Sequence, residues 1–136
     1  MTPCFADSYY FFALLSPRDE AHSNAMEINA RLRRPIVTTA WILTEVGDGL
    51  AQTPSRRLFV PLWRRLVADP RVTIVEPDQP TFERGIALFE GRPDKRWSLT
   101  DCISFVIMRD HGLTDALTAD RHFEQAGINT LLTETR

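Results

Sequence analysis

The sequence contains little cysteine: Cys4 and Cys102 are the only two in 136 residues. They lie far apart and form no CxxC pair, which argues against a disulfide framework and a zinc site, and we expect two small buried residues. No stretch approaches the roughly 18 consecutive apolar residues that span a bilayer, which excludes a membrane protein. A short apolar run near the N-terminus lacks a preceding basic region and is interrupted by Asp7. We therefore expect no secretory signal and a cytoplasmic protein.

An excess of positive charge is also missing, since the formal net charge is −2 and the pI is about 5.9. Such a chain does not hold nucleic acid by its overall charge. The charge is unevenly distributed, however, because residues 31–71 contain eight arginines against three acids. Our candidates for contacting phosphate are two adjacent pairs, Arg56 with Arg57 and Arg64 with Arg65. Solvated helix faces are the simpler alternative for this segment.

Length and composition fit one ordinary globular domain. The chain is 43% hydrophobic and 25% charged, and it is long enough to bury a core without disulfides or a structural metal. No repeat, low-complexity tract or long linker divides the sequence. We therefore expect a single domain over residues 1–136.

Segments typical of strands and helices alternate along the chain. The predicted strands cover residues 4–7, 36–40, 72–77, 116–119 and 128–132. The predicted helices cover residues 8–16, 17–33, 41–52, 55–69, 81–91 with Asp78 as its cap, 98–112 and 122–127, and Pro61 kinks the fourth or divides it in two. Because each parallel strand needs a crossover helix, we predict an α/β three-layer sandwich with a mainly parallel central sheet flanked by helices.

Four acids occupy positions that such a sheet would bring together. Asp7 and Asp120 close two strands, and ligands of parallel sheets collect outside the carboxyl ends of the strands. Glu45 lies on the helix after the second strand, and Asp101 lies in the first turn of the helix SLTDCISFVIM. Each acid also has a simple local alternative: a helix cap for Asp7, an Asx-type turn for Asp120, a solvated flank for Glu45, and a capping box with Ser98 for Asp101.

Carboxylates that gather at one point repel one another, and their pKa values rise unless a cation neutralises the group. The cation that suits them is Mg²⁺ or Mn²⁺, a hard ion that prefers carboxylate oxygens and water and completes its shell with substrate phosphate. Such an ion lowers the pKa of water and neutralises charge on phosphate oxygens. Taken together, the four acids indicate metal-dependent chemistry at phosphorus.

Four segments follow one another over essentially the whole chain: FADSYYFFALL, TTAWILTE, WSLTDCISFVIM and ALTADRHFEQAGINTLL. In this order they resemble the VapC-like group of PIN-domain proteins, the ribonuclease toxins of bacterial toxin–antitoxin pairs. The resemblance implies that Asp7, Glu45, Asp101 and Asp120 match the family's metal-binding acidic quartet. It also implies that Thr118 matches the hydroxyl residue two positions before the last acid and supports the cluster by hydrogen bonding.

The resemblance further implies an Mg²⁺- or Mn²⁺-dependent endoribonuclease that hydrolyses RNA phosphodiester bonds, the toxin of a type II toxin–antitoxin pair. RNA would then be held by the local arginine pairs, since the whole chain is mildly acidic. The family also implies a homodimer, and a small antitoxin protein whose tail covers the acidic site.

Other functions compete with this interpretation. The main alternative is a non-catalytic PIN-fold module that binds RNA or a partner protein. A phosphoacceptor or phosphatase role for Asp7 is disfavoured because the second acid of a DxD motif is absent, and no GxSxG, Walker or dinucleotide motif occurs. The histidines show no metal-ligand spacing, and we interpret His122 as a surface or packed residue in preference to a substrate contact.

Overall fold

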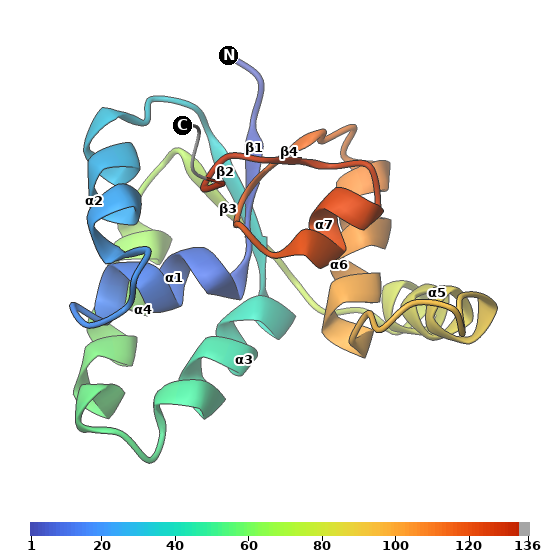
Figure 1. Cartoon of the computed structure of the whole chain (residues 1–136), viewed down its shortest axis with the longest axis horizontal. Helices are drawn as coiled ribbons and strands as arrows, with labels where there is room; N and C mark the ends of the chain where they lie inside the picture. The colour runs from blue at the N-terminus through green and yellow to red at the C-terminus, as the bar shows by residue number, and fades with distance from the viewer. Residues whose placement is uncertain (134–136) are drawn as a thin grey trace.

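The structure is a computed structural model that describes residues 1–133 (Figure 1). Its centre is a five-stranded sheet in the order β3-β2-β1-β4-β5, in which every pair of neighbouring strands is parallel. The strands are β1 (Cys4–Ala6), β2 (Ile36–Thr39), β3 (Val72–Val75), β4 (Asp115–Leu117) and β5 (Asn129–Thr130). Each overlaps one of the predicted strands, and the predicted parallel sheet is confirmed.

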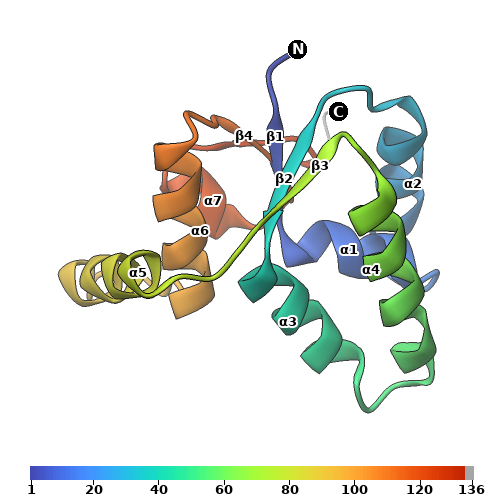
Figure 2. The same ribbon diagram turned by 180° about the vertical axis from the view of Figure 1, so that it is seen from behind.

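Helices cover both sides of the sheet. They are α1 (Ser8–Leu15), α2 (His22–Arg31), α3 (Ala40–Leu50), the 3-10 helix η1 (Pro54–Leu58), α4 (Phe59–Ala68), α5 (Gln79–Gly91), α6 (Leu99–Asp110) and α7 (Arg121–Gln125). In Figure 1, α1, α2 and α4 lie on one side of the strands and α5, α6 and α7 on the other, and Figure 2 shows the same division from behind. The three-layer prediction is confirmed. No helix within residues 1–133 is long and apolar enough to cross a bilayer.

The predicted helix over residues 55–69 consists of two pieces, and the boundary between them does not fall at Pro61. The boundary between η1 and α4 falls before Phe59. Pro61 lies in the first turn of α4, where a backbone N–H has no intrahelical acceptor and its loss breaks no hydrogen bond.

Close packing against α5 fixes the position of α6. A Cβ atom at Gly85 of α5 would lie 2.4 Å from Cγ1 of Ile103 in α6, which is closer than a real Cβ atom approaches. Along α6, residues 102–108 are all buried. The helix ends at Asp110, and Gly112 then turns the chain with φ at +66°, in agreement with the predicted end. Both cysteines are free and buried, as predicted.

The strand order creates a switch point between β1 and β4. From β1 the chain continues to β2 and β3 on one side of the sheet, and it later returns to β4 and β5 on the other. Ligands of open parallel sheets bind in the crevice outside the carboxyl ends of the strands at such a point. Asp7 follows β1 directly, and Asp120 lies three residues beyond the end of β4. The fold therefore brings two of the predicted site residues to this crevice.

Candidate functional site

Asp7 is a deeply buried acid, with 4% of its surface exposed. It occupies the N-cap position of α1, but its side chain makes no capping hydrogen bond. Its Oδ2 atom instead accepts a hydrogen bond from the Thr118 hydroxyl at 2.9 Å. The local capping role is therefore wrong for Asp7, and the carboxyl is directed toward the segment that follows β4.

Burial raises the pKa of the Asp7 carboxyl to about 7. The hydrogen bond from Thr118 opposes this rise, whereas the nearby negative charges of Asp101 and Glu45 add to it. These couplings show that three of the four predicted acids share one electrostatic environment, although they come from three separate elements.

Thr118 connects the two strand ends. Its hydroxyl, which is buried, donates to Asp7 and accepts a hydrogen bond from the backbone N–H of Asp120 at 3.1 Å. One hydroxyl can make both bonds because it has one proton and two lone pairs. The side chain thereby fixes the Asp7 carboxyl relative to the loop that carries Asp120.

Asp101 forms the capping box that its sequence context suggests. Ser98 is the N-cap of α6, and its Oγ accepts the backbone N–H of Asp101 at 3.0 Å. The Asp101 Oδ2 atom in turn accepts the backbone N–H of Ser98 at 3.1 Å. Among residues 1–133 the other oxygen, Oδ1, has no hydrogen-bond donor. The capping role thus leaves one carboxylate oxygen available for a ligand.

Asp120 caps α7 and brings His122 beside Asp101. The Asp120 Oδ1 atom accepts the backbone N–H of His122 at 2.9 Å, as an Asx-type turn requires. The His122 Nδ1 atom lies 3.0 Å from Oδ2 of Asp101 and 3.7 Å from Oδ1 of Asp120. These three residues each offer a ligand atom within 4.8 Å of the others, and they form the one such group of three in residues 1–133.

Glu45 completes the electrostatic cluster from α3. This helix begins after Thr39, the last residue of β2, whose side chain caps it by accepting the backbone N–H of Ile42. Burial raises the pKa of the Glu45 carboxyl, the Ser8 hydroxyl opposes the shift, and the charges of Asp101 and Asp120 add to it. Glu45 is therefore coupled to two of the acids across the crevice.

The cluster lacks a basic partner that would neutralise it. In residues 1–133, no lysine or arginine forms an ion pair with Asp7, Glu45, Asp101 or Asp120, and His122 is the one potentially cationic contact. A hard divalent cation with carboxylate and water ligands fits this donor set. The assignment of the four acids as metal ligands stays a prediction, and the geometry adds His122, which the sequence interpretation set aside.

The four arginines predicted to bind RNA lie on η1 and α4 and are exposed. Arg65 lines a groove together with Ile36 and Val72, the first residues of β2 and β3. That groove is therefore at the amino ends of the strands, away from Asp7. RNA binding by Arg56, Arg57, Arg64 and Arg65 stays a prediction.

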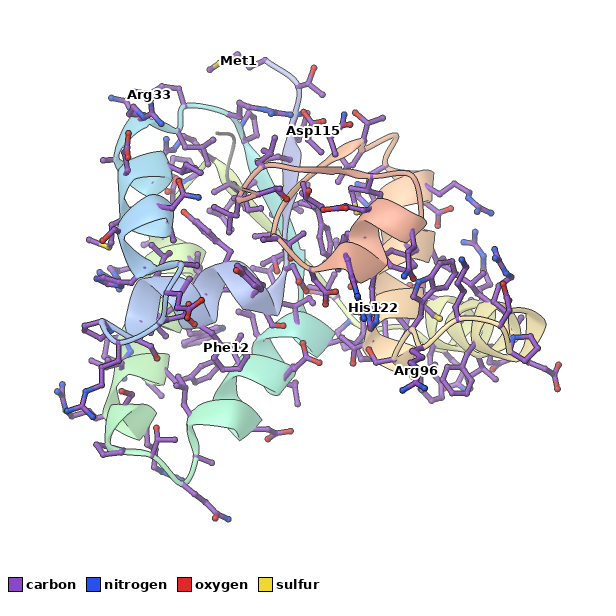
Figure 3. All side chains as sticks on the ribbon, viewed as in Figure 1. Met1, Phe12, Arg33, Arg96, Asp115 and His122 are labelled. Atoms are coloured by element: carbon purple, nitrogen blue, oxygen red, sulfur yellow. The ribbon has the colours of Figure 1, made fainter. Side chains whose placement is uncertain are left out.

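Two arginines that the sequence interpretation did not single out flank the acids. Arg121 directly follows Asp120, and Arg96 lies two residues before Ser98, the partner of Asp101; both arginines are exposed. Figure 3 shows Arg96 and His122 toward the lower end of the strands, whereas Asp115 lies at the upper end. Basic residues beside the acids in the sequence were the signal that would have found them.

Comparisons with known proteins agree with this geometry. A family model described as the PIN domain matches residues 4–129. Comparison with curated protein sequences gives no significant match. Among solved structures, VapC20 from Mycobacterium tuberculosis, described as a sarcin–ricin loop cleaving toxin, has a TM-score of 0.84 and 22% identity, covering 92% of this chain and 95% of that one.

Two further solved structures share the fold. FitAcB from Neisseria gonorrhoeae has a TM-score of 0.65 and 17% identity, covering 93% of this chain and 95% of that one. A toxin–antitoxin complex from Klebsiella pneumoniae has a TM-score of 0.59 and 19% identity, covering 87% of each chain. At such identities the structures show a common fold, and the family match extends over all four acids of the site. The chain belongs to the PIN domain family.

Proposed function

We propose that this protein is an Mg²⁺- or Mn²⁺-dependent endoribonuclease that hydrolyses RNA phosphodiester bonds. The observation that carries the proposal is the Asp7 carboxyl, which is buried, has no basic partner within residues 1–133 and has its pKa raised to about 7. Burying an ionised acid without a partner costs stability, and a bound cation removes that cost. Membership of the PIN domain family supports the same conclusion.

In this proposal Asp7, Glu45, Asp101 and Asp120 hold the cation directly or through water. The cation supplies Lewis acidity, which acidifies water for attack on phosphorus and neutralises charge on the phosphate oxygens. Thr118 keeps the Asp7 carboxyl aimed into the crevice through its hydrogen bond. The capping box keeps the Asp101 carboxyl in place and leaves its Oδ1 atom available.

RNA approaches the crevice along basic side chains. Arg96 and Arg121 are placed to contact the phosphates next to the scissile bond, because they flank Asp101 and Asp120 in the chain. The exposed pairs on η1 and α4 contact a more distant part of the same RNA. Such contacts hold the backbone without reading the sequence, so they position the RNA and do not choose the cleavage site.

We further propose that the enzyme is the toxin of a type II toxin–antitoxin pair that acts in the cytoplasm, forms a homodimer and binds an antitoxin protein. Similar solved structures include a toxin–antitoxin complex from Klebsiella pneumoniae and a DNA-bound VapBC from Salmonella typhimurium. Val60, Trp63 and Val67 on α4 are exposed apolar side chains at helical spacing, a surface that suits a protein partner. Light scattering of the purified chain measures its oligomeric state. Co-purification with the product of a neighbouring reading frame tests whether it binds an antitoxin.

The experiment that tests the activity is cleavage of a panel of structured RNAs that includes the sarcin–ricin loop. We expect internal cleavage with Mg²⁺ or Mn²⁺, and loss of cleavage with EDTA and in Asp7→Asn. Asp115→Asn, which changes an acid at the other end of the sheet, is the matched control and should cleave like the wild type. Cleavage that survives both the chelator and Asp7→Asn would show that the activity comes from elsewhere.

A non-catalytic module that binds RNA or a partner protein is the second candidate. One observation favours it: the side chains of Asp101 and Asp120 both cap helix N-termini, and a capping role needs no metal. This alternative predicts that divalent cations leave the melting temperature unchanged and that Asp101→Asn binds its partner normally. A melting curve with and without Mn²⁺ separates the two functions before any substrate is known.

A further inference from the structure

We propose that His122 is a nitrogen ligand of the metal site and that it gives the site a preference for Mn²⁺ over Mg²⁺. The inference rests on the metal site of the proposed function and deepens it by assigning a ligand outside the four acids. Its basis is the position of one ring nitrogen between two of those acids.

The separations around this nitrogen suit a shared ion. Nδ1 of His122 lies 3.0 Å from Oδ2 of Asp101 and 3.7 Å from Oδ1 of Asp120. Ligand atoms in adjacent positions of an octahedral ion, each bonded at about 2.1 Å, are about 3.0 Å apart. The contact between the ring and Asp101 also has the length of a hydrogen bond, and its oxygen, Oδ2, accepts the backbone N–H of Ser98 as well. An ion shared with the ring would replace the ring's hydrogen bond on Oδ2 beside the cap, and Oδ1 would stay available for a second contact.

The position of His122 is fixed by its surroundings. Its backbone N–H donates to Asp120, so the residue is tied to one of the acids whose ion it would share. The next residue, Phe123, is fully buried and stacks edge-on against Phe105 of α6. The ring itself keeps 26% of its side-chain surface exposed, which leaves it open to an ion that enters from the crevice.

A nitrogen donor changes which ion the site prefers. Carboxylate and water oxygens suit Mg²⁺ and Mn²⁺ alike, whereas imidazole suits transition-metal ions and is a poor ligand for Mg²⁺. With His122 as a ligand, Mn²⁺ gains a bond that Mg²⁺ does not use well. The four acids alone give no such discrimination.

The test is electron spin-echo spectroscopy of Mn²⁺ bound to the full chain, together with the dissociation constants of Mn²⁺ and Mg²⁺. We expect a ¹⁴N coupling on Mn²⁺ in the wild type, and its loss in His122→Gln. The preference for Mn²⁺ over Mg²⁺ should fall by about tenfold in that variant. Mutations of groups that support a metal site typically lower metal affinity by about 10-fold to 100-fold, and we expect the lower value here. The matched control is His111→Gln, which changes an exposed histidine at the end of α6 and should keep the coupling.

A second variant keeps the test independent of simple loss of binding. His122→Asp replaces the nitrogen with an oxygen, so it should still bind metal, lose the ¹⁴N coupling and shift its preference toward Mg²⁺. Bound Mn²⁺ without a nitrogen coupling in the wild type, an unchanged preference in His122→Gln, or no binding of Mn²⁺ at all would each overturn the inference.

RNA cleavage, measured on the same samples, separates this inference from the proposed function. Nitrogen coupling without cleavage of any RNA in the panel would contradict the proposed ribonuclease activity and support His122 as a metal ligand. Metal-dependent cleavage without nitrogen coupling would support the ribonuclease activity and contradict the assignment of His122 as a ligand.

Discussion

Acids at the two ends of the central strands have opposite surroundings and opposite pKa shifts. At the amino end, Asp115 of β4 forms an ion pair with Arg34 at 2.8 Å. The hydrogen bond from Asn129 and the contact with Arg34 lower the pKa of Asp115. At the carboxyl end, the Asp7 carboxyl accepts the hydroxyl of Thr118, no lysine or arginine of the described part of the chain pairs with it, and burial raises its pKa to about 7.

The difference is between an acid whose charge is compensated by partners and an acid whose charge is not. A structural acid stabilises a protein only when a partner compensates for its lost hydration, and Asp115 has such partners. An acid that is buried without them lowers stability and is retained where a function requires it. The contrast supports the proposed metal site, and four experiments test it.

The largest expected effect is the loss of RNA cleavage in Asp7→Asn. We expect a decrease of about 10³-fold, equivalent to about 4 kcal/mol of transition-state stabilisation, because the amide cannot replace a charged metal ligand. Asp115→Asn should cleave at close to the wild-type rate. Initial rates on one cleaved RNA give the comparison, and equal losses in the two variants would remove the distinction between the two ends of the sheet.

Opposite pH dependences of stability are expected from the two acids in the metal-free protein. The pKa of an aspartate in the unfolded chain is 3.8, and the pKa of Asp7 in the folded protein is about 7. The stability contributed by protonated Asp7 is therefore full at low pH and is lost as the pH rises to about 7, by up to about 4 kcal/mol. Asp115 has a lowered pKa, so its contribution is present at neutral pH and is lost as the pH falls through the folded pKa.

Urea denaturation in the presence of a chelator measures this contrast from acid to neutral pH. Asp7→Asn should lack the decline toward neutral pH that the wild type shows, and Asp115→Asn should lack part of the decline toward acid pH. A wild type and an Asp7→Asn variant with parallel pH profiles would mean that Asp7 ionises normally in the folded protein.

Metal binding and helix capping by Asp101 can be separated with two variants. At a cation concentration about 100 times the dissociation constant, the wild type should gain about 2.7 kcal/mol in its free energy of unfolding. Asp101→Asn should largely keep the fold and lose this gain. Ser98→Ala should cost about 1 kcal/mol through the cap and keep the gain. Calorimetry with and without Mn²⁺ checks both, and equal behaviour of the two variants would reduce Asp101 to a capping residue.

The smallest effect is expected at the paired end of the sheet. The side chains of Arg34 and Asp115 are 23% and 22% exposed, so Arg34→Gln should cost no more than about 1 kcal/mol. Cleavage and metal affinity should be unchanged. Thermal melts and RNA assays of this variant test whether the amino end contributes only to stability; a large loss of cleavage would contradict that view.

The sequence was sufficient to predict the sheet and the strand ends that carry acids. Alternating β-branched and helical segments determine a parallel sheet, and a parallel sheet brings Asp7 and Asp120 to the same end. The capping box of Asp101 could be predicted because it depends on residues three apart. The boundary before Phe59 could not be placed, because several positions around Pro61 satisfy the same helix rules.

The position of His122 beside Asp101 could not be predicted in the same way. The direction of the His122 ring depends on the local Asp120 cap and on the packing of Phe123 against Phe105 of α6, and the second of these is a contact between distant segments. Local spacing gives no metal motif because Asp101, the third donor of the group, lies 21 residues before His122. Arg96 and Arg121, by contrast, lie beside the capping box of Asp101 and beside Asp120 in the sequence, and that adjacency is sufficient to select them as candidates.

The central position of β1 has a consequence for synthesis of the chain. Asp7 is made early, but its neighbour β4 and its hydrogen-bond partner Thr118 are made more than a hundred residues later. Until then one edge of β1 is open and the first acid of the site has no fixed orientation. A growing chain therefore carries the residues of the proposed site on the ribosome in an unassembled state, and the acidic cluster is complete only when β4 has joined the sheet.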